Sequence, residues 1–330
     1  MDIFKSLIDN DDIKKSLGLA ILENRFSHAY IIEGADGTGK RTIARLASAG
    51  ILCQNREKSL PCGRCDACRK VLSDSCVDVR FLEITKVDEV RDLRSTLYES
   101  SAEYDYKIYI IENAEKMNIK AQNALLISLE EPPKNVVFFL LTTDASALLE
   151  TIRSRAQILR TKLLSKDAIF SYIKENSTSS YDEEKLMEIV ISSAGSLGYA
   201  LDMLDEKKGE EVLALRRKAV ELVDAIIKNN ADSVTFMSSL FSQTREDLKE
   251  LFSLGVTVIG DIILLKRDEN APLYFFSSAE DGIKMGGSHS LQRLLSIYDA
   301  LLEAKDSLNS NANVPLTLMS ILTSSKKKGN

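Results

Sequence analysis

Residues 29–42 read AYIIEGADGTGKRT, and most of the expected architecture follows from them. Ala29 to Glu33 is short and rich in aliphatic and aromatic residues, which predicts a buried strand. A glycine-rich turn follows, and Arg41 to Cys53 has the apolar spacing of a helix. A strand, a glycine-rich turn and a helix in this order begin an α/β unit with a parallel sheet.

The glycine-rich turn fits the pattern of a Walker A phosphate loop. Its glycines let backbone N–H groups turn toward phosphate oxygens, the N-terminus of the next helix adds positive potential, and Lys40 supplies a point charge. A turn that binds no nucleotide remains the alternative, because the match is incomplete. The sequence predicts a degenerate nucleotide site that includes Gly34, Gly37, Thr38, Gly39, Lys40 and Thr42.

Arg41 stands where the pattern requires a Ser or Thr hydroxyl to bind magnesium. A guanidinium has no acceptor atom and cannot ligate a cation. Thr42 lies about 100° further round the helix and is poorly placed to replace the hydroxyl. We therefore expect magnesium placement to suffer more than phosphate binding, and whether ATP and Mg²⁺ bind stays open.

Residues 107–112 form a second motif, the apolar run KIYIIE, which ends in an acidic residue. A strand of this kind brings its terminal carboxylate, here Glu112, near the phosphate loop, where it can hold magnesium. The next residue, Asn113, is a neutral carboxamide and cannot act as a general base. The alternative is a solvated strand end without a role.

Four cysteines follow the phosphate-loop helix with the spacing Cys-x8-Cys-x2-Cys-x2-Cys, namely Cys53, Cys62, Cys65 and Cys68. Four thiolates can close a tetrahedral zinc shell, which leaves no position for a water molecule, so we expect a structural zinc. An iron–sulfur site and buried thiols without metal remain alternatives. Cys76 lies outside the spacing and is expected to be a packed, free thiol.

The remaining chain divides by its patterns into three expected domains. Further strands are expected at residues 79–84, 107–111, 136–142 and 158–161, and a helix at 119–129 that ends before two prolines. After residue 162 helical periodicity replaces the strand pattern. A length of 330 residues suits two or three domains, and we place them at 1–163, 164–207 and 208–330.

Composition limits the possible functions. The net charge of −6 argues against a surface that binds nucleic acid everywhere, so any DNA contact must be local or shared with partners. No run of about 18 apolar residues could span a bilayer, and the first residues are unlike a secretory signal. We expect a cytoplasmic protein without a membrane segment.

Several longer stretches resemble the clamp-loader branch of the AAA+ family in bacterial DNA polymerase III. They are RFSHAY at 25–30, NALL at 123–126, LEEPP at 129–133, TTD at 142–144 and TIRSRA at 151–156, together with the cysteine module. The resemblance covers most of residues 1–205 and, more weakly, the C-terminal helices. It implies a P-loop AAA+ sheet domain with a zinc module, a small helical lid domain and an all-α collar domain.

The resemblance also implies roles for single residues. Arg155 would be an arginine finger that reaches the γ-phosphate held by a neighbouring subunit, with a surface salt bridge as the alternative. Thr143 falls at the sensor-1 position beside the nucleotide, and Glu112 at the metal position. Gly198 falls where a motor subunit carries the sensor-2 arginine.

Three of these positions lack a hydrolytic group, at Arg41, Asn113 and Gly198, whereas Arg155 is retained. This combination resembles the delta-prime type of subunit, a non-hydrolysing stator with no independent activity. Its implied partners are the gamma/tau and delta subunits and, through the complex, the sliding clamp and primer-template DNA. The alternative is an active gamma/tau-type ATPase. A zinc-containing nucleic-acid-processing enzyme is less favoured, because no further acidic or nucleophilic cluster is present.

Overall fold

A computed structural model describes residues 7–55, 61–176, 182–269, 271, 273–276, 278–287, 289–309 and 312–327. They fall into two compact units. The first comprises Met1–Ala168 and Ser196–Gly198, and the second Ile169–Gly195 and Tyr199–Asn330. Within the described residues, no helix is both long enough and apolar enough to cross a membrane.

A five-stranded parallel sheet forms the centre of the first unit, as the sequence predicts. The strand order is β2-β3-β4-β1-β5. The strands are β1 (Ala29–Glu33), β2 (Val79–Glu83), β3 (Lys107–Glu112), β4 (Val136–Thr142) and β5 (Gln157–Arg160), each within one residue of its expected bounds. Because the strands are parallel, the carboxyl ends of β1, β3 and β4 lie along one edge. The glycine-rich loop begins there after β1, and the acidic motif ends there with Glu112.

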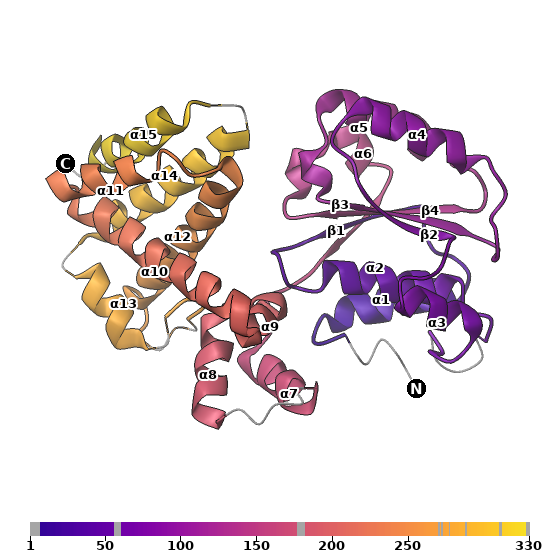
Figure 1. Cartoon of the computed structure of the whole chain (residues 1–330), viewed down its shortest axis with the longest axis horizontal. Coiled ribbons are helices and arrows are strands. Elements are labelled where there is room, and N and C mark those ends of the chain that lie inside the picture. The colour runs from indigo at the N-terminus through magenta and orange to yellow at the C-terminus, as the bar shows by residue number, and fades with distance from the viewer. Residues whose placement is uncertain are drawn as a thin grey trace. The chain divides into compact units, whose positions relative to one another are not determined.

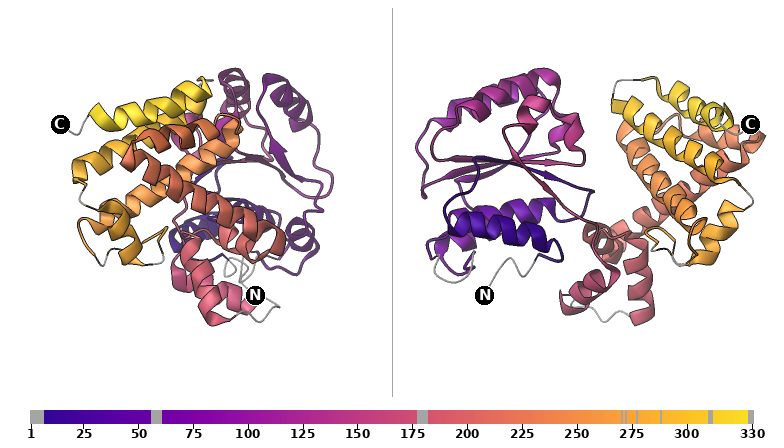
Figure 2. Two further views of the ribbon diagram at one scale, coloured as in Figure 1. Left: turned by 60° about the vertical axis from the view of Figure 1, so that its left-hand side comes forward. Right: turned by 180° about the vertical axis from the view of Figure 1, so that it is seen from behind.

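Helices cover both faces of this sheet (Figures 1 and 2). One face carries α1 (Asp11–Leu22), α2 (Lys40–Ile51) and α3 (Asp66–Leu72), and the other α4 (Val87–Leu97), α5 (Ile119–Glu130) and α6 (Glu150–Arg153). Tyr30 and Ile32 belong to the core under α1–α3, whereas Ala29 and Ile31 belong to the opposite core. This alternation follows because successive side chains of a strand point to opposite faces. Short 3-10 turns, η2 (Ala114–Lys116) and η3 (Ala145–Ala147), follow β3 and β4.

The second unit is helical in its described residues, as expected from the loss of strand patterns after residue 162. Its helices are α7 (Lys166–Asn176), α8 (Glu183–Ser192), α9 (Leu197–Leu204), α10 (Glu206–Lys228), α11 (Ala231–Ser239), α12 (Arg245–Leu265), α13 (Ala279–Gly286), α14 (Leu291–Asn309) and α15 (Val314–Lys327), of which α7 and α9 start in the first unit. Helix α12 packs against α10, α13 and α14. The expected boundary at 207/208 falls in the first turn of α10, and the three-domain division stays a prediction.

Candidate functional site

The phosphate loop lies between β1 and α2, where the sequence places it. Gly37 and Gly39 have φ angles of 73° and 91°, a left-handed region that glycine adopts without strain. A Cβ at Gly34 would lie 1.8 Å from the hydroxyl oxygen of Thr161. Thr38 Oγ1 donates to the carbonyl of Ala35 at 2.7 Å and lies 2.7 Å from the same hydroxyl. The loop therefore has a defined backbone course that requires its glycines.

The loop's lysine is engaged by the loop itself. Lys40 Nζ donates to the carbonyl oxygens of Gly34 at 2.6 Å and Ala35 at 3.1 Å, and to Asp36 Oδ1 at 3.0 Å. Its side chain is only 12% exposed. Thr42 is exposed on α2. A bound phosphate would have to replace these carbonyl contacts of Lys40.

Arg41 and Glu112 form one ion pair, a contact that sequence patterns did not reveal. Arg41 Nη1 lies 2.6 Å from each carboxylate oxygen of Glu112. The guanidinium carbon lies 4.1 Å from the ring centroid of Phe81 on β2, a cation–π arrangement. The residue that replaces the magnesium-binding hydroxyl thus binds the carboxylate expected at the metal position.

The residues after β3 and β4 make further pairs. Asn113 has a left-handed backbone, and its Nδ2 donates to Glu83 Oε1 at 3.1 Å. This hydrogen bond, and after it that of Lys116, lowers the pKa of Glu83. Thr143 Oγ1 donates to Glu115 Oε1 at 2.9 Å, and its place at a sensor-1 position stays a prediction. The sequence patterns missed Glu115 and Glu83, since neither belongs to a known motif spacing.

Gly198 meets the phosphate loop through its backbone. Its N–H donates to the carbonyl of Gly37 at 3.3 Å, and residues 196–198 group with the first unit. A Cβ at Gly198 would lie 2.9 Å from the Gly37 Cα, closer than side-chain atoms pack. Glycine is therefore required for this close approach, and a sensor-2 arginine does not fit this arrangement.

Arg155 follows α6 and is 35% exposed. Its Nη2 lies 2.8 Å from Glu130 Oε1 at the end of α5, and Nη1 donates to the carbonyl of Thr151 at 3.0 Å. Arg155 therefore makes the surface salt bridge that was the alternative, while part of its side chain remains exposed.

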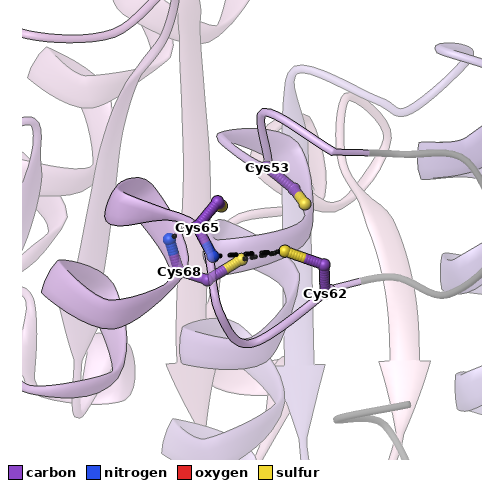
Figure 3. A group of neighbouring side chains, drawn as sticks. All are labelled: Cys53, Cys62, Cys65 and Cys68. Atoms are coloured by element: carbon purple, nitrogen blue, oxygen red, sulfur yellow. Dashed lines mark hydrogen bonds between the residues drawn. The ribbon is translucent and has the colours of Figure 1, made fainter. Parts of the chain in front are cut away.

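The four predicted cysteine ligands converge at the end of α2 and the start of α3 (Figure 3). Their Sγ atoms all lie within 4.8 Å of one another, and those of Cys62 and Cys68 are 3.9 Å apart. In a tetrahedral shell with Zn–S bonds of about 2.3 Å, neighbouring sulfurs are about 3.8 Å apart. The four sulfurs are thus compatible with a zinc ion and require little contraction to hold it.

Backbone N–H groups donate hydrogen bonds to two of these sulfurs, which favours their thiolate form. The N–H groups of Cys65 and Cys68 donate to the sulfurs of Cys62 and Cys65 at 3.4 and 3.5 Å. Burial raises the pKa of Cys53 and of Cys68, so both thiols favour the protonated form until a metal ion replaces the proton. Burial also acts to raise the pKa of Cys62, but backbone N–H groups of Arg64 and Cys65 outweigh it and lower this pKa to about 6. This lowered pKa favours the thiolate form of Cys62, the form that binds a metal ion.

The sequence comparisons find similarity to subunits of DNA polymerase III. Residues 9–165 match the family described as DNA polymerase III, delta subunit. The DNA polymerase III subunit gamma of Buchnera aphidicola subsp. Schizaphis graminum is 34% identical, over 61% of this chain and 57% of its own length. The DNA polymerase III subunit tau of Bacillus subtilis is 31% identical, over 80% of this chain and 49% of its own length.

Among solved structures, a DNA polymerase III gamma subunit-related protein of Thermotoga maritima is 22% identical and aligns over 96% of this chain and 99% of that chain, with a TM-score of 0.44. The similarity to DNA polymerase III subunits therefore rests on the sequence matches and not on this structural match. This chain spans about half the length of the two curated relatives named above.

Proposed function

We propose that this chain, a relative of the gamma and tau subunits of DNA polymerase III, is a subunit of the clamp loader of that polymerase. The match of residues 9–165 to the delta-subunit family supports this assignment, since it covers nearly all of the sheet and its helices. In this proposal the chain joins gamma/tau and delta subunits to load a sliding clamp on primer-template DNA. Its cytoplasmic location stays a prediction.

Within the clamp loader, we assign the chain the role of a delta-prime-type stator that does not hydrolyse ATP. The observation that carries this assignment is the pair between Arg41 and Glu112. A hydrolytic site needs a carboxylate free to hold Mg²⁺ and a second one to orient the attacking water. Here the guanidinium of Arg41 pairs with the first carboxylate, Glu112. A carboxamide, Asn113, stands where the second carboxylate is needed.

In this proposal, Arg155 is the residue of the stator that reaches the γ-phosphate held by a neighbouring subunit. An arginine supplied in trans can neutralise the charge that develops on a transferring γ-phosphate, and such residues contribute about 10³–10⁵ in rate in GTPases. The partial exposure of Arg155 and its exchangeable contact with Glu130 support this role. The zinc proposed at the four cysteines has a structural role only, because a four-sulfur shell has no open position.

A second candidate is an active gamma/tau-type ATPase. It is favoured by the names of the curated relatives and by the retained loop residues Gly37, Gly39 and Lys40. ATP turnover by the isolated chain with primed DNA separates the two candidates. A stator turns over no ATP above background, whereas a rate comparable to that of a gamma subunit would exclude the stator assignment.

The finger is tested in a complex reconstituted with gamma/tau, delta, clamp and primed DNA. Arg155→Ala is expected to reduce ATP hydrolysis by the complex at least about tenfold at the site it completes. Arg45→Ala is the matched control, because Arg45 makes a similar ion pair with Asp74 on the other side of the sheet. Equal ATPase and clamp loading by both variants would remove the finger role from Arg155.

A further inference from the structure

The pair between Arg41 and Glu112 has the geometry of a bound cation. Arg41 Nη1 is equidistant, at 2.6 Å, from both carboxylate oxygens. A carboxylate that holds a metal ion bidentately surrounds the ion in the same way. We propose that the Arg41 guanidinium occupies the divalent-cation position of this phosphate loop, so that the site admits no Mg²⁺ beside a nucleotide phosphate.

Two contacts fix the guanidinium at this position. Glu112 ends β3, and Phe81 on β2 lies under the guanidinium at 4.1 Å. Glu112 is 27% exposed and Arg41 is 47% exposed, so the pair is partly shielded from solvent. The guanidinium is therefore held between the ring and the carboxylate.

The charges of the loop explain why a second cation is excluded. Mg²⁺ would need the oxygens of Glu112, which Arg41 holds, and would lie next to a fixed positive charge of the same sign. Lys40, one residue earlier, already provides an ammonium group inside the loop. The two side chains together supply the positive charge that a nucleotide phosphate requires, and the chain needs no metal ion for it.

This inference deepens the proposed function and rests on it for its role in the complex. A phosphate site that excludes divalent cations holds a nucleotide, if at all, in a form that cannot be hydrolysed. The test below uses the isolated chain without DNA or partners. The stator assignment and the cation exclusion can therefore fail separately.

The test is the melting temperature of the full, zinc-loaded chain in ADP, with and without Mg²⁺. Magnesium is omitted rather than chelated, because a chelator would also attack the cysteine site. For the native sequence, adding Mg²⁺ is expected to leave the effect of ADP unchanged. Arg41→Ser frees Glu112 and restores a hydroxyl, so Mg²⁺ is expected to tighten ADP binding at least about tenfold, seen as an added rise in melting temperature.

Arg45→Ser is the matched control. Arg45 lies one turn further along α2, with its guanidinium 5.7 Å from the ring of Phe81, but it pairs with Asp74. Removing it leaves Glu112 occupied, so this variant should respond like the native chain. In Arg41→Ser combined with Glu112→Gln, the gained Mg²⁺ dependence should disappear, because the ion loses its carboxylate.

The possible outcomes decide the proposal in each case. The proposal is supported if the native chain binds ADP equally well with and without Mg²⁺. It is also supported if the native chain binds no ADP while Arg41→Ser binds ADP in a Mg²⁺-dependent way. A native chain that binds ADP more tightly with Mg²⁺ overturns it. So does a folded Arg41→Ser or Arg41→Thr variant without Mg²⁺ dependence, or a gained dependence that survives Glu112→Gln. Circular dichroism checks the folding of each variant, and the native chain decides alone if they misfold.

Discussion

Ion pairs within the chain engage Arg41 of the proposed nucleotide site and Arg155, the proposed arginine finger. Arg41 holds Glu112, and Glu130 holds Arg155. All four side chains are partly exposed, and such pairs typically contribute about 0–1 kcal/mol to stability. The pair between Glu130 and Arg155 is weak enough to exchange for a better partner, such as a phosphate, and this exchange is part of the proposed role. Arg41 differs because the ring of Phe81 holds it in addition to Glu112.

Glu130 is therefore expected to compete with the neighbour's γ-phosphate for Arg155. An exposed pair is worth about 0.2–1 kcal/mol, which corresponds to a factor of roughly 1.4–5. Glu130→Gln should raise ATP hydrolysis by the reconstituted complex within that range and change the chain's own stability by less than about 1 kcal/mol. Glu131→Gln, an exposed neighbour, is the control. A decrease in hydrolysis would mean that Glu130 presents Arg155 instead of competing for it.

Asp261 on α12 is a buried carboxylate whose role is structural. It is 1% exposed and accepts the backbone N–H groups of Tyr274, Phe275 and Phe276 at 2.7–3.0 Å. Asp261→Asn replaces one acceptor oxygen by a donor that faces these N–H groups. We expect a loss of about 2 kcal/mol in the free energy of unfolding, measured by urea denaturation. Glu303→Gln, exposed in the middle of α14, should change it by less than about 0.5 kcal/mol.

At the scale of elements, packing of α13 on α12 depends on a missing side chain. A Cβ at Gly286 would lie 2.7 Å from Ile262 Cγ2, and Ile262 is branched at Cβ and stiff. Gly286→Ala should therefore destabilise the chain by about 1–2 kcal/mol, since overpacking exceeds the gain in helix propensity. A Cβ at Gly260, inside α12, would meet no atom within 4 Å apart from its chain neighbours and the backbone of its own helix. Gly260→Ala should instead stabilise by about 0.5–1 kcal/mol, and equal effects of both changes would contradict the packing argument.

The cysteine cluster links the end of α2 to the start of α3. Each element is short, and the sulfurs of Cys62 and Cys68 are buried between them. Removal of zinc by a chelator is expected to lower stability by about 3 kcal/mol or more, roughly 10 °C in melting temperature, and metal analysis should find about one zinc per chain. Cys68→Ser should reproduce the loss. Cys76→Ser, outside the cluster, should retain zinc, and retention by Cys68→Ser would exclude this ligand set.

Sequence patterns predicted the strands well because each strand is a local apolar run between turn residues. The phosphate loop and the cysteine cluster were also predictable, since each depends on spacing within a short segment. The pairs Arg41–Glu112, Thr143–Glu115 and Arg155–Glu130 were not, because they join segments that only the folded sheet brings together. Patterns identified Arg41 as a missing hydroxyl but could not show which group its charge would meet.

At the scale of the whole molecule, the two units have separate hydrophobic cores. The sheet of the first unit is covered by one core on each face. The second unit has a core of its own between residues 219 and 322, built from α10, α11, α12, α14 and α15 with the segment that precedes α13. A core that lies within one stretch of the chain can form without the rest, as independent domains do.

A fragment of residues 205–330 is therefore expected to fold alone, because it contains this core and the whole of α10. Calorimetry should give it one cooperative transition, near a transition that the full chain also shows. A chelator should lower only the other transition of the full chain, since the cysteines belong to the first unit. If the fragment fails to fold, the collar is not an independent domain. If chelation shifts every transition of the full chain equally, the two units unfold as one cooperative body.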